Sequence, residues 1–320
     1  MRIWPVPAVA AGLAATVAFA TAAMDSNRAY EHLRQMVLLG PRPSGSAALQ
    51  QTRDYITQQL AAMGVAVETQ PFTADTPVGP IRMVNLVARL PGRRADRILI
   101  TGHYDTKRFA GFRFVGASDG ASSAAILIEL VRALKGTTHE FTDEFVWFDG
   151  EEAVCRDWDE CNRPGAPDHT YGSRHYVAAA RESNTLRSIR AMILLDMVGA
   201  RDLKIRRETD FSAPWLNDLV WATARRLGDA STFVNADGPV GGDDHQPFAE
   251  AGVPTIDLID LMDYPEWHTA EDDLAHVAAR SLQIVGDVVL ASLPDIERHL
   301  AAAHEPGPIS PPSPAGTPPR

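Results

Sequence analysis

The sequence is poor in cysteine and in basic residues. Its 320 residues include 2 cysteines, too few to stabilise a disulfide-rich fold. Lysine and arginine together number 30 against 41 aspartates and glutamates, giving a formal net charge of −11 at pH 7. A nucleic-acid surface needs clustered basic residues, so this balance argues against nucleic acid as a partner. Internal repeats and interior low-complexity linkers are also lacking, which favours a single catalytic domain.

The two ends of the chain differ in composition from the middle. Residues 1–23 consist of Arg2, an almost wholly apolar stretch and small residues at its end, a pattern typical of a secretory signal peptide. The alternative is an uncleaved membrane anchor, since about 20 apolar residues span a bilayer. We therefore expect an exported protein, periplasmic or secreted, that contacts a membrane only through residues 1–23 if they are retained. Proline, glycine and serine dominate residues 303–320, which predicts a disordered tail and leaves residues 24–302 for the catalytic domain.

Short apolar runs alternate with helical patterns along this domain. The first helix is expected to begin with Ser26 as its cap and to stop at Gly40. Hydrophobic patterning predicts further helices at 47–63, 119–134, 170–182, 213–227, 246–251 and 275–302, and strands at 65–67, 84–90, 98–101, 145–148, 192–195 and 255–259. The alternation predicts an α/β fold, a single domain with a central, mostly parallel twisted sheet flanked by helices and an antiparallel edge.

Acids and histidines follow several of the predicted strands directly. His103 and Asp105 come after the run at 98–101, Glu151 and Glu152 after 145–148, and Asp196 after 192–195. Taken singly, each is more simply a helix cap or a surface pair. In a parallel sheet, however, ligand sites gather at the carboxyl edge, so the sequence predicts that these side chains share one site.

The chemistry of these residue types suits a metal. A catalytic zinc takes three ligands from Asp, Glu or His and keeps a fourth position open. Adjacent residues at a strand end point in different directions, so one member of the Glu151–Glu152 pair can bind metal while the other carries a proton. Cys155 and Cys161 lie close together in the next loop; export favours a short disulfide between them, and two free thiols are the alternative.

Several blocks of sequence resemble the zinc aminopeptidase clan and, within it, most closely the glutaminyl cyclase family. These blocks are His103–Lys107, Ser118–Asp119, Asp149–Ala153, Tyr171–His175, Asp243–Phe248 and Trp267–Thr269. Ser118 before Asp119, Asp149-Gly150 before the two glutamates and Trp267 before His268 favour the cyclases over the aminopeptidases of the clan.

The resemblance implies conversion of the N-terminal glutamine of peptides or proteins to pyroglutamate, with release of ammonia. It implies one Zn²⁺ per chain held by Asp119, Glu152 and His268, with Glu151 as general acid/base. It also implies Asp196 beside the reacting amide, Asp243 in the proton-handling network, and pocket walls formed by Trp267, Trp158 and Tyr264. Asp257 departs from the animal cyclases, which have a histidine there, and His245 is expected to support the site without binding metal.

Two other functions compete with this one. A two-zinc aminopeptidase would use His103 and Asp196 for a second metal with Asp119 bridging, and every residue it needs is present. An inactive binding domain of the same clan would have lost ligands, and none is lost. His139, His169 and His276 are expected to be ordinary residues of loops or exposed helix faces.

Overall fold

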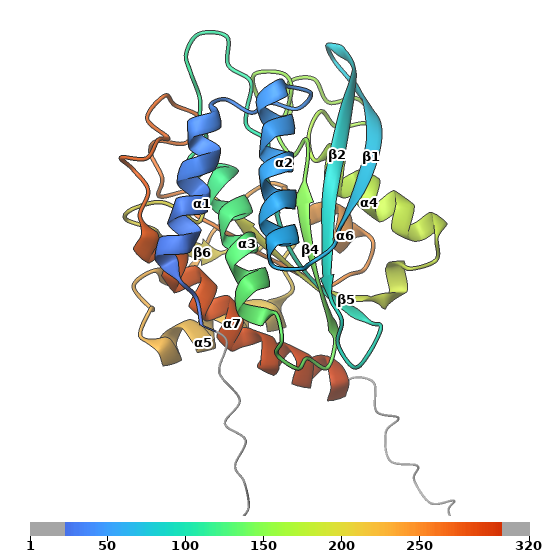
Figure 1. Ribbon diagram of the computed structural model, residues 1–320, viewed down its shortest axis with the longest axis vertical. Coiled ribbons are helices and arrows are strands. Elements are labelled where there is room, and N and C mark those ends of the chain that lie inside the picture. The colour runs from blue at the N-terminus through green and yellow to red at the C-terminus, as the bar shows by residue number, and fades with distance from the viewer. Residues whose placement is uncertain (1–22, 303–320) are drawn as a thin grey trace, which may run out of the picture.

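The computed structural model describes residues 23–302 (Figure 1). The predicted signal peptide or anchor, but for Ala23, and the predicted tail at 303–320 lie outside the described residues. Within the described part of the chain, no helix is both long and apolar enough to cross a membrane.

A six-stranded sheet organises the described residues. Its order is β1 (Val67–Thr76), β2 (Gly79–Leu90), β4 (Thr142–Phe148), β3 (Arg97–His103), β5 (Ile189–Asp196) and β8 (Thr255–Ile259). The pairs β3–β4, β3–β5 and β5–β8 are parallel, whereas β1–β2 and β2–β4 are antiparallel. The α/β fold with a mostly parallel sheet and an antiparallel edge is thus confirmed. A separate pair of short strands, β6 (Ile205–Arg207) and β7 (Phe233–Asp237), has no counterpart in the sequence prediction.

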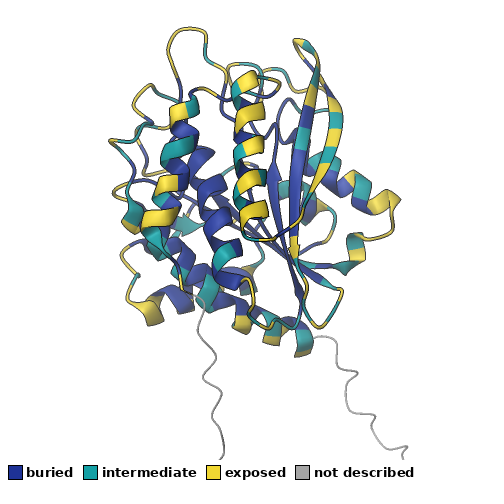
Figure 2. Ribbon diagram, in the orientation of Figure 1, coloured by how far each residue is buried: buried dark blue, intermediate teal, exposed yellow. Residues whose placement is uncertain are grey.

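Helices cover both faces of the sheet (Figure 1). They are α1 (Ser26–Leu39), α2 (Ala47–Ala62), α3 (Ala121–Leu134), α4 (Tyr171–Glu182), α5 (Pro214–Leu227), α6 (Gln246–Glu250) and α7 (Ala279–Ala302). Alternate residues of each strand point to opposite faces, so Ile98 and Ile100 join the core under α1, α3 and α7, while Leu99 joins the core under α4 and α6. Every residue of β3 and β4 is buried (Figure 2), which explains the apolar runs at 98–100 and 145–148 within these strands.

Two details of the predicted elements need correction. Asp25, and not Ser26, caps α1: its carboxylate accepts hydrogen bonds from the backbone nitrogens of Asn27 and Arg28 at 3.1 and 3.2 Å. The predicted strand at 65–67 meets β1 only at Val67, where β1 begins; β1 extends from there to Thr76 and pairs along its whole length with β2. Most of β1 is exposed or only half-buried at the sheet edge. Its residues are therefore largely polar, and hydrophobic patterning does not identify it as a strand.

Candidate active site

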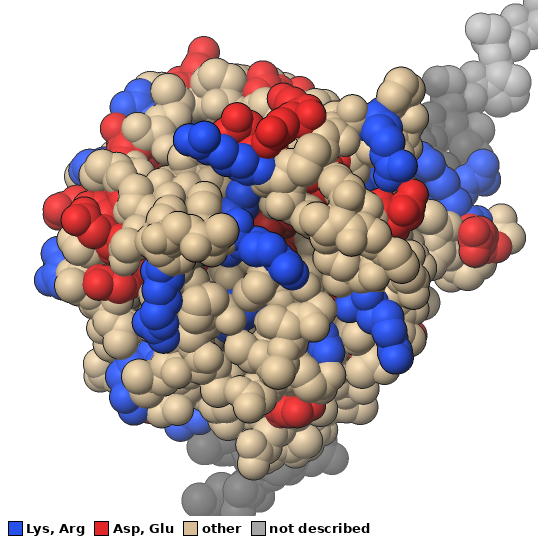
Figure 3. Space-filling view, turned by 90° about the horizontal axis from the view of Figure 1, so that it is seen from above, with Lys and Arg blue, Asp and Glu red and all other residues tan. Residues whose placement is uncertain are grey.

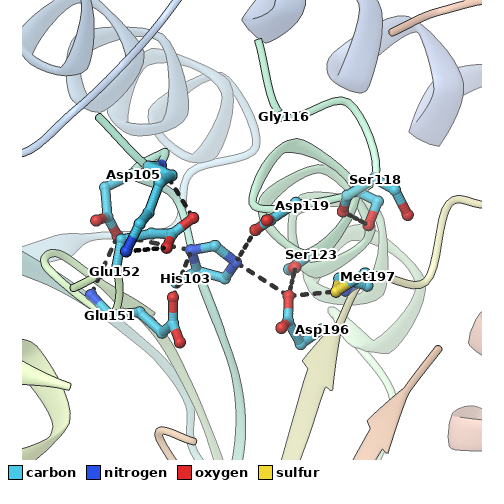
Figure 4. Close-up of polar contacts among 12 residues, drawn as sticks. His103, Asp105, Gly116, Ser118, Asp119, Ser123, Glu151, Glu152, Asp196 and Met197 are labelled. Atoms are coloured by element: carbon cyan, nitrogen blue, oxygen red, sulfur yellow. Dashed lines mark hydrogen bonds and ion pairs between the residues drawn. The ribbon is translucent and has the colours of Figure 1, made fainter. Parts of the chain in front are cut away.

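The predicted site residues gather where the parallel strands end. His103 is the last residue of β3 and Asp196 is the last of β5, while Glu151 and Glu152 come three and four residues after the end of β4. The register pairs His103 with Phe148, so the ends of β3 and β4 lie level. Figure 4 shows His103 between Asp119 and Asp196 on one side and Asp105 and Glu151 on the other. The carboxyl edge of the sheet therefore brings these side chains together as predicted.

Asp119, Glu152 and His268 form the group expected to hold zinc. The Nε2 atom of His268 lies 3.4 Å from Asp119 Oδ2 and 3.4 Å from Glu152 Oε2, and the three donor atoms lie within 4.8 Å of one another. Asp119 Oδ2 is buried without a hydrogen-bond partner. The backbone nitrogen of Lys107 donates to Glu152 Oε1 at 2.9 Å, which leaves Oε2 facing His268. Two carboxylates, one imidazole and an unpaired oxygen fit a zinc ion.

Hydrogen bonds and unusual backbone conformations fix the chain around Asp119 and His268. The carboxylate of Asp272 accepts hydrogen bonds from the backbone nitrogens of Ser118 and Asp119 at 2.7 and 3.0 Å. Gly120 has φ +89°, and a Cβ there would collide with the carbonyl oxygen of Asp105. His268 itself adopts a left-handed conformation with φ 56°. Such conformations are uncommon outside glycine and are often found at functional sites.

Glu151 lies beside this group with a strongly perturbed acidity. Burial raises the pKa of Glu151 well above its ordinary value; the nearby carboxylates of Asp243 and Glu152 raise it further, against the opposing effect of His103. The same edge also holds Asp243, whose pKa is raised well above its ordinary value by burial and by the charge of Asp196. A carboxyl group with a raised pKa can both take up and return a proton near neutral pH.

His103, Asp119 and Asp196 converge as well. His103 Nε2 lies 2.9 Å from Asp196 Oδ1 and 3.2 Å from Asp119 Oδ1, while Nδ1 is 3.7 Å from Glu151 Oε2. Burial lowers the pKa of His103, but the neighbouring carboxylates outweigh it and raise the pKa well above its ordinary value. The residues that a two-zinc aminopeptidase needs are therefore in place, and a protonated His103 can supply positive charge between the two aspartates.

A cavity of about 470 Å³ opens over these residues. Trp158 and Trp267 line it together with Glu151 and Asp243. Seen from above, this face of the molecule mixes basic and acidic side chains (Figure 3). A mixed surface of this kind suits a peptide better than a polyanion.

Tyr264 does not line this cavity, contrary to expectation. Its side chain is turned inward: it is 5% exposed, and its hydroxyl donates to Asp272 Oδ1 at 2.7 Å. Tyr264 thus supports the aspartate that orients Asp119. The apolar side chains of Val240, Ile259 and Leu261 line the cavity instead, and their isolated positions in loops and at a strand end gave no signal in the sequence.

The loop that carries Trp158 is closed by a disulfide between Cys155 and Cys161, the alternative that export favours over two free thiols. Trp158 stacks on His169, with 4.1 Å between the ring centres. His169 lies in a loop, as expected, but it is buried there, with 5% of its surface exposed. Trp267 stacks on His268, a predicted zinc ligand, at 4.2 Å between ring centres and keeps 41% of its surface exposed.

Comparison with known proteins agrees with this site. The model of Peptidase family M28 matches residues 85–293. A glutaminyl-peptide cyclotransferase-like protein from Mus musculus is 35% identical over 269 residues, covering 75% of this chain and 68% of that protein. The crystal structure of a glutaminyl cyclase from an Acidobacteriales bacterium superposes with a TM-score of 0.81 at 34% identity, covering 90% of this chain and 100% of that one. A leucine aminopeptidase precursor from Bacteroides thetaiotaomicron gives a TM-score of 0.78 at 26% identity, covering 86% and 98%. The chain belongs to peptidase family M28 and, within that family, is similar to the glutaminyl-peptide cyclotransferases.

Proposed function

We propose that this protein is a zinc-dependent glutaminyl-peptide cyclotransferase, an acyltransferase that converts the N-terminal glutamine of peptides or proteins to pyroglutamate and releases ammonia. The observation that carries the proposal is the position of Glu151, a buried carboxyl group with a raised pKa, next to the Asp119–Glu152–His268 group in a cavity walled by tryptophan. The cyclotransferases among its relatives support the same reaction.

The reaction closes a ring within one residue. A bond forms between the α-nitrogen and the side-chain amide carbon, and the bond from that carbon to the departing nitrogen breaks. Because nucleophile and electrophile belong to the same residue, the cavity needs only to hold them in the ring-closing geometry. Glu151 accepts a proton from the α-amine and returns it to the departing nitrogen, a cycle that leaves its own charge unchanged. Zinc, when bound, polarises the amide oxygen as a Lewis acid.

Asp196 and Asp243 complete the polar wall of the cavity. Asp196 Oδ1 is fixed by His103 Nε2 at 2.9 Å and by the backbone nitrogen of Met197 at 2.7 Å. The carboxylate of Asp196 is therefore oriented to accept a hydrogen bond from the substrate amide. Asp243, which interacts electrostatically with Glu151, helps to share the transferred proton.

Trp158 and Trp267 form the apolar sides of the proposed glutamine pocket. Closely packed aromatic walls exclude water from the site and strengthen its electrostatic interactions. Because Trp267 is 41% exposed, it marks the mouth of the cavity. The rest of a peptide substrate would leave the cavity along this residue.

We further propose one zinc ion in this active site, a catalytic domain spanning residues 24–302, and export through residues 1–23, either cleaved or kept as a membrane anchor. The disulfide between Cys155 and Cys161 supports export, because such bonds persist in oxidising compartments.

The second candidate function is a two-zinc aminopeptidase, which the convergence of His103, Asp119 and Asp196 favours. Mass spectrometry separates the two. The purified protein is incubated with a peptide that begins with glutamine and with a matched peptide that begins with leucine. Loss of ammonia from the glutamine peptide without shortening supports cyclisation. Removal of the first residue from either peptide, with no cyclised product, would overturn it. Activity lost to a chelator and restored by added zinc is the control for metal dependence.

A further inference from the structure

Another cavity, of about 530 Å³, is formed by the edge strand β1 and the helices α4 and α6. Phe72 of β1, Arg174 and Arg181 of α4 and Pro247 of α6 line it. Figure 1 shows α4 beside the edge of the sheet that β1 and β2 form. Among the described residues, none lines both this cavity and the cavity over the proposed zinc ligands. Sites for small molecules enclose roughly 300–1,000 Å³, so this cavity is large enough for one.

Basic residues outnumber acidic ones on the walls of this cavity, whereas the chain as a whole is acidic. The charged residues that line it are Arg163, Arg174, Arg181, Asp75 and Glu250. Both carboxylates are already engaged, because Asp75 Oδ2 lies 3.2 Å from Arg163 Nη2 and Glu250 Oε1 accepts the side-chain amide of Gln246 at 2.8 Å. Neither Arg174 nor Arg181 has a carboxylate of the described chain within 4.0 Å. The cavity therefore presents two guanidinium groups without an anionic partner.

The guanidinium group of Arg174 is fixed in the cavity wall. Its Nη2 atom donates to the backbone carbonyl oxygens of Pro167 and His169, both at 2.7 Å, and its central carbon lies 5.0 Å from the centre of the Tyr171 ring. Burial lowers the pKa of Arg174 below its ordinary value, which shows that its positive charge is incompletely solvated. Carbonyl oxygens satisfy its hydrogen atoms but do not neutralise its charge. A bound anion would do so without any rearrangement of the side chain.

Other parts of the wall are apolar. Ala74 and Val177 line the cavity and are 5% and 3% exposed. Phe72 stacks on the His175 ring, with 4.3 Å between ring centres and 12° between ring planes. Burial lowers the pKa of His175, so its ring is neutral at pH 7 and extends the flat, uncharged surface. These walls suit a ligand that carries an apolar or aromatic body as well as a charge.

We propose that this cavity, called the anion cavity below, binds a small organic carboxylate with an apolar or aromatic body. Guanidinium groups bind carboxylates through paired, charge-assisted hydrogen bonds, and Arg174 and Arg181 supply such groups. The apolar walls would contact the rest of the ligand. The site goes beyond the cyclisation reaction and does not depend on it.

The anion cavity shares a loop with the proposed active site. Residues 156–159 line the cavity over the proposed zinc ligands, whereas Arg163 and residues 165–167 line the anion cavity. Arg174 joins the two, because it holds the backbone carbonyl of His169, whose ring stacks on Trp158. A carboxylate bound to Arg174 would therefore also restrain the loop that carries Trp158.

The test uses benzoate, an aromatic carboxylate, and benzamide, its uncharged counterpart of nearly equal shape. Binding to the zinc-loaded, full-length protein is measured by isothermal titration calorimetry. Benzoate is expected to bind saturably and Arg181→Gln to weaken it by about tenfold, as expected for loss of one charge-assisted hydrogen bond. Arg225→Gln is the matched control, since Arg225 is an exposed arginine in the last turn of α5 as Arg181 is in the last turn of α4, and it should leave the affinity unchanged.

Hydrogen exchange of the wild type locates the bound benzoate independently of any variant. Benzoate should slow the exchange of backbone amides within residues 162–181, where the loop and α4 form the anion cavity. Protection confined to other segments, or an affinity that Arg181→Gln leaves unchanged, would assign benzoate to a different site and overturn the proposal. Absence of saturable binding would also overturn it. Binding of benzamide or of inorganic phosphate as tight as that of benzoate would refute the proposed class of ligand.

Discussion

Replacing Glu151 by glutamine should abolish turnover while leaving zinc in place. Glutamine keeps the size of the side chain and loses the ability to accept a proton. The backbone nitrogen of Glu151 donates to Asp105 Oδ1 at 3.3 Å, a contact that the substitution does not change. Glu151 is also outside the group of side chains expected to bind the metal. The change therefore isolates proton transfer from metal binding.

The expected fall in kcat depends on whether a neighbouring carboxylate could accept the proton in place of Glu151. General acid/base groups contribute about 10²–10⁴-fold to a rate. Asp196 Oδ1 is already engaged by His103 and by the backbone nitrogen of Met197, and Asp243 Oδ1 accepts the backbone nitrogen of Asp244. Because one carboxylate oxygen of each aspartate is already engaged, we expect the upper part of that range, a fall in kcat of about 10³–10⁴-fold, equivalent to about 4–5.5 kcal/mol of transition-state stabilisation.

The assay measures ammonia release from a glutamine-initiated peptide together with zinc content. Glu151→Gln should retain the zinc content of the wild type and a KM within a few-fold of it. Glu152→Gln should instead lose zinc along with activity, and Glu182→Gln, an exposed change at the end of α4, should alter neither. A Glu151→Gln enzyme with more than a tenth of wild-type kcat would refute the assigned role. Loss of zinc from that variant would show that Glu151 is a ligand.

Three further predictions concern stability and substrate binding. Burial lowers the pKa of His32, whose ring lies 2.7 Å from the Tyr55 hydroxyl, to about 4 from 6.5. Between these two pH values the unfolded chain therefore binds more protons than the folded one, so about 3 kcal/mol of the free energy of unfolding should be lost as the pH falls from 6.5 to 4. Measured by urea unfolding at pH 7 and at pH 4.5, the loss should be smaller for His32→Gln than for the wild type. Equal losses in the two proteins would contradict this. Trp158→Ala should raise KM by roughly tenfold with little change in kcat, since it removes one side of the substrate cavity and no reacting group. A larger effect on kcat than on KM would show that Trp158 does more than line the cavity. Glu144→Gln should lower the free energy of unfolding, measured by chemical denaturation, by about 3–5 kcal/mol, because it breaks a buried ion pair with Arg97, 3.0 Å away. A decrease below about 1 kcal/mol would show that this ion pair does not stabilise the fold.

Elements buried on both faces were the most predictable. The mainly apolar runs within β3, β4, β5 and β8 locate the strands, and the polar residues after the runs of β3, β4 and β5 locate the site. This works because a parallel sheet places all its carboxyl ends at one edge. The strands predicted at 65–67 and 84–90 cover only parts of β1 and β2, because an exposed edge hairpin needs no apolar pattern.

Side-chain direction was the main thing that the sequence did not reveal. Tyr264 and Trp267 are three residues apart in one loop, yet the first points inward to Asp272 and the second lines the cavity. The loop has no regular periodicity that would distinguish them. The pairing of His245 with Glu208 joins residues 37 positions apart and depends on how the loops pack over the sheet, so spacing alone gave no signal for it.

The Cys155–Cys161 bond has a practical consequence for any preparation of the enzyme. It closes a loop with a sequence separation of 6 around Trp158 and the neighbouring cavity residues. A chain produced in a reducing cytosol would carry two thiols in its place, and its loop would lose the restraint on this wall. Batches of equal purity and equal zinc content would then differ in apparent affinity for substrate according to their oxidation history. A free-thiol titration is therefore a measure of how much of a sample has its binding pocket correctly formed.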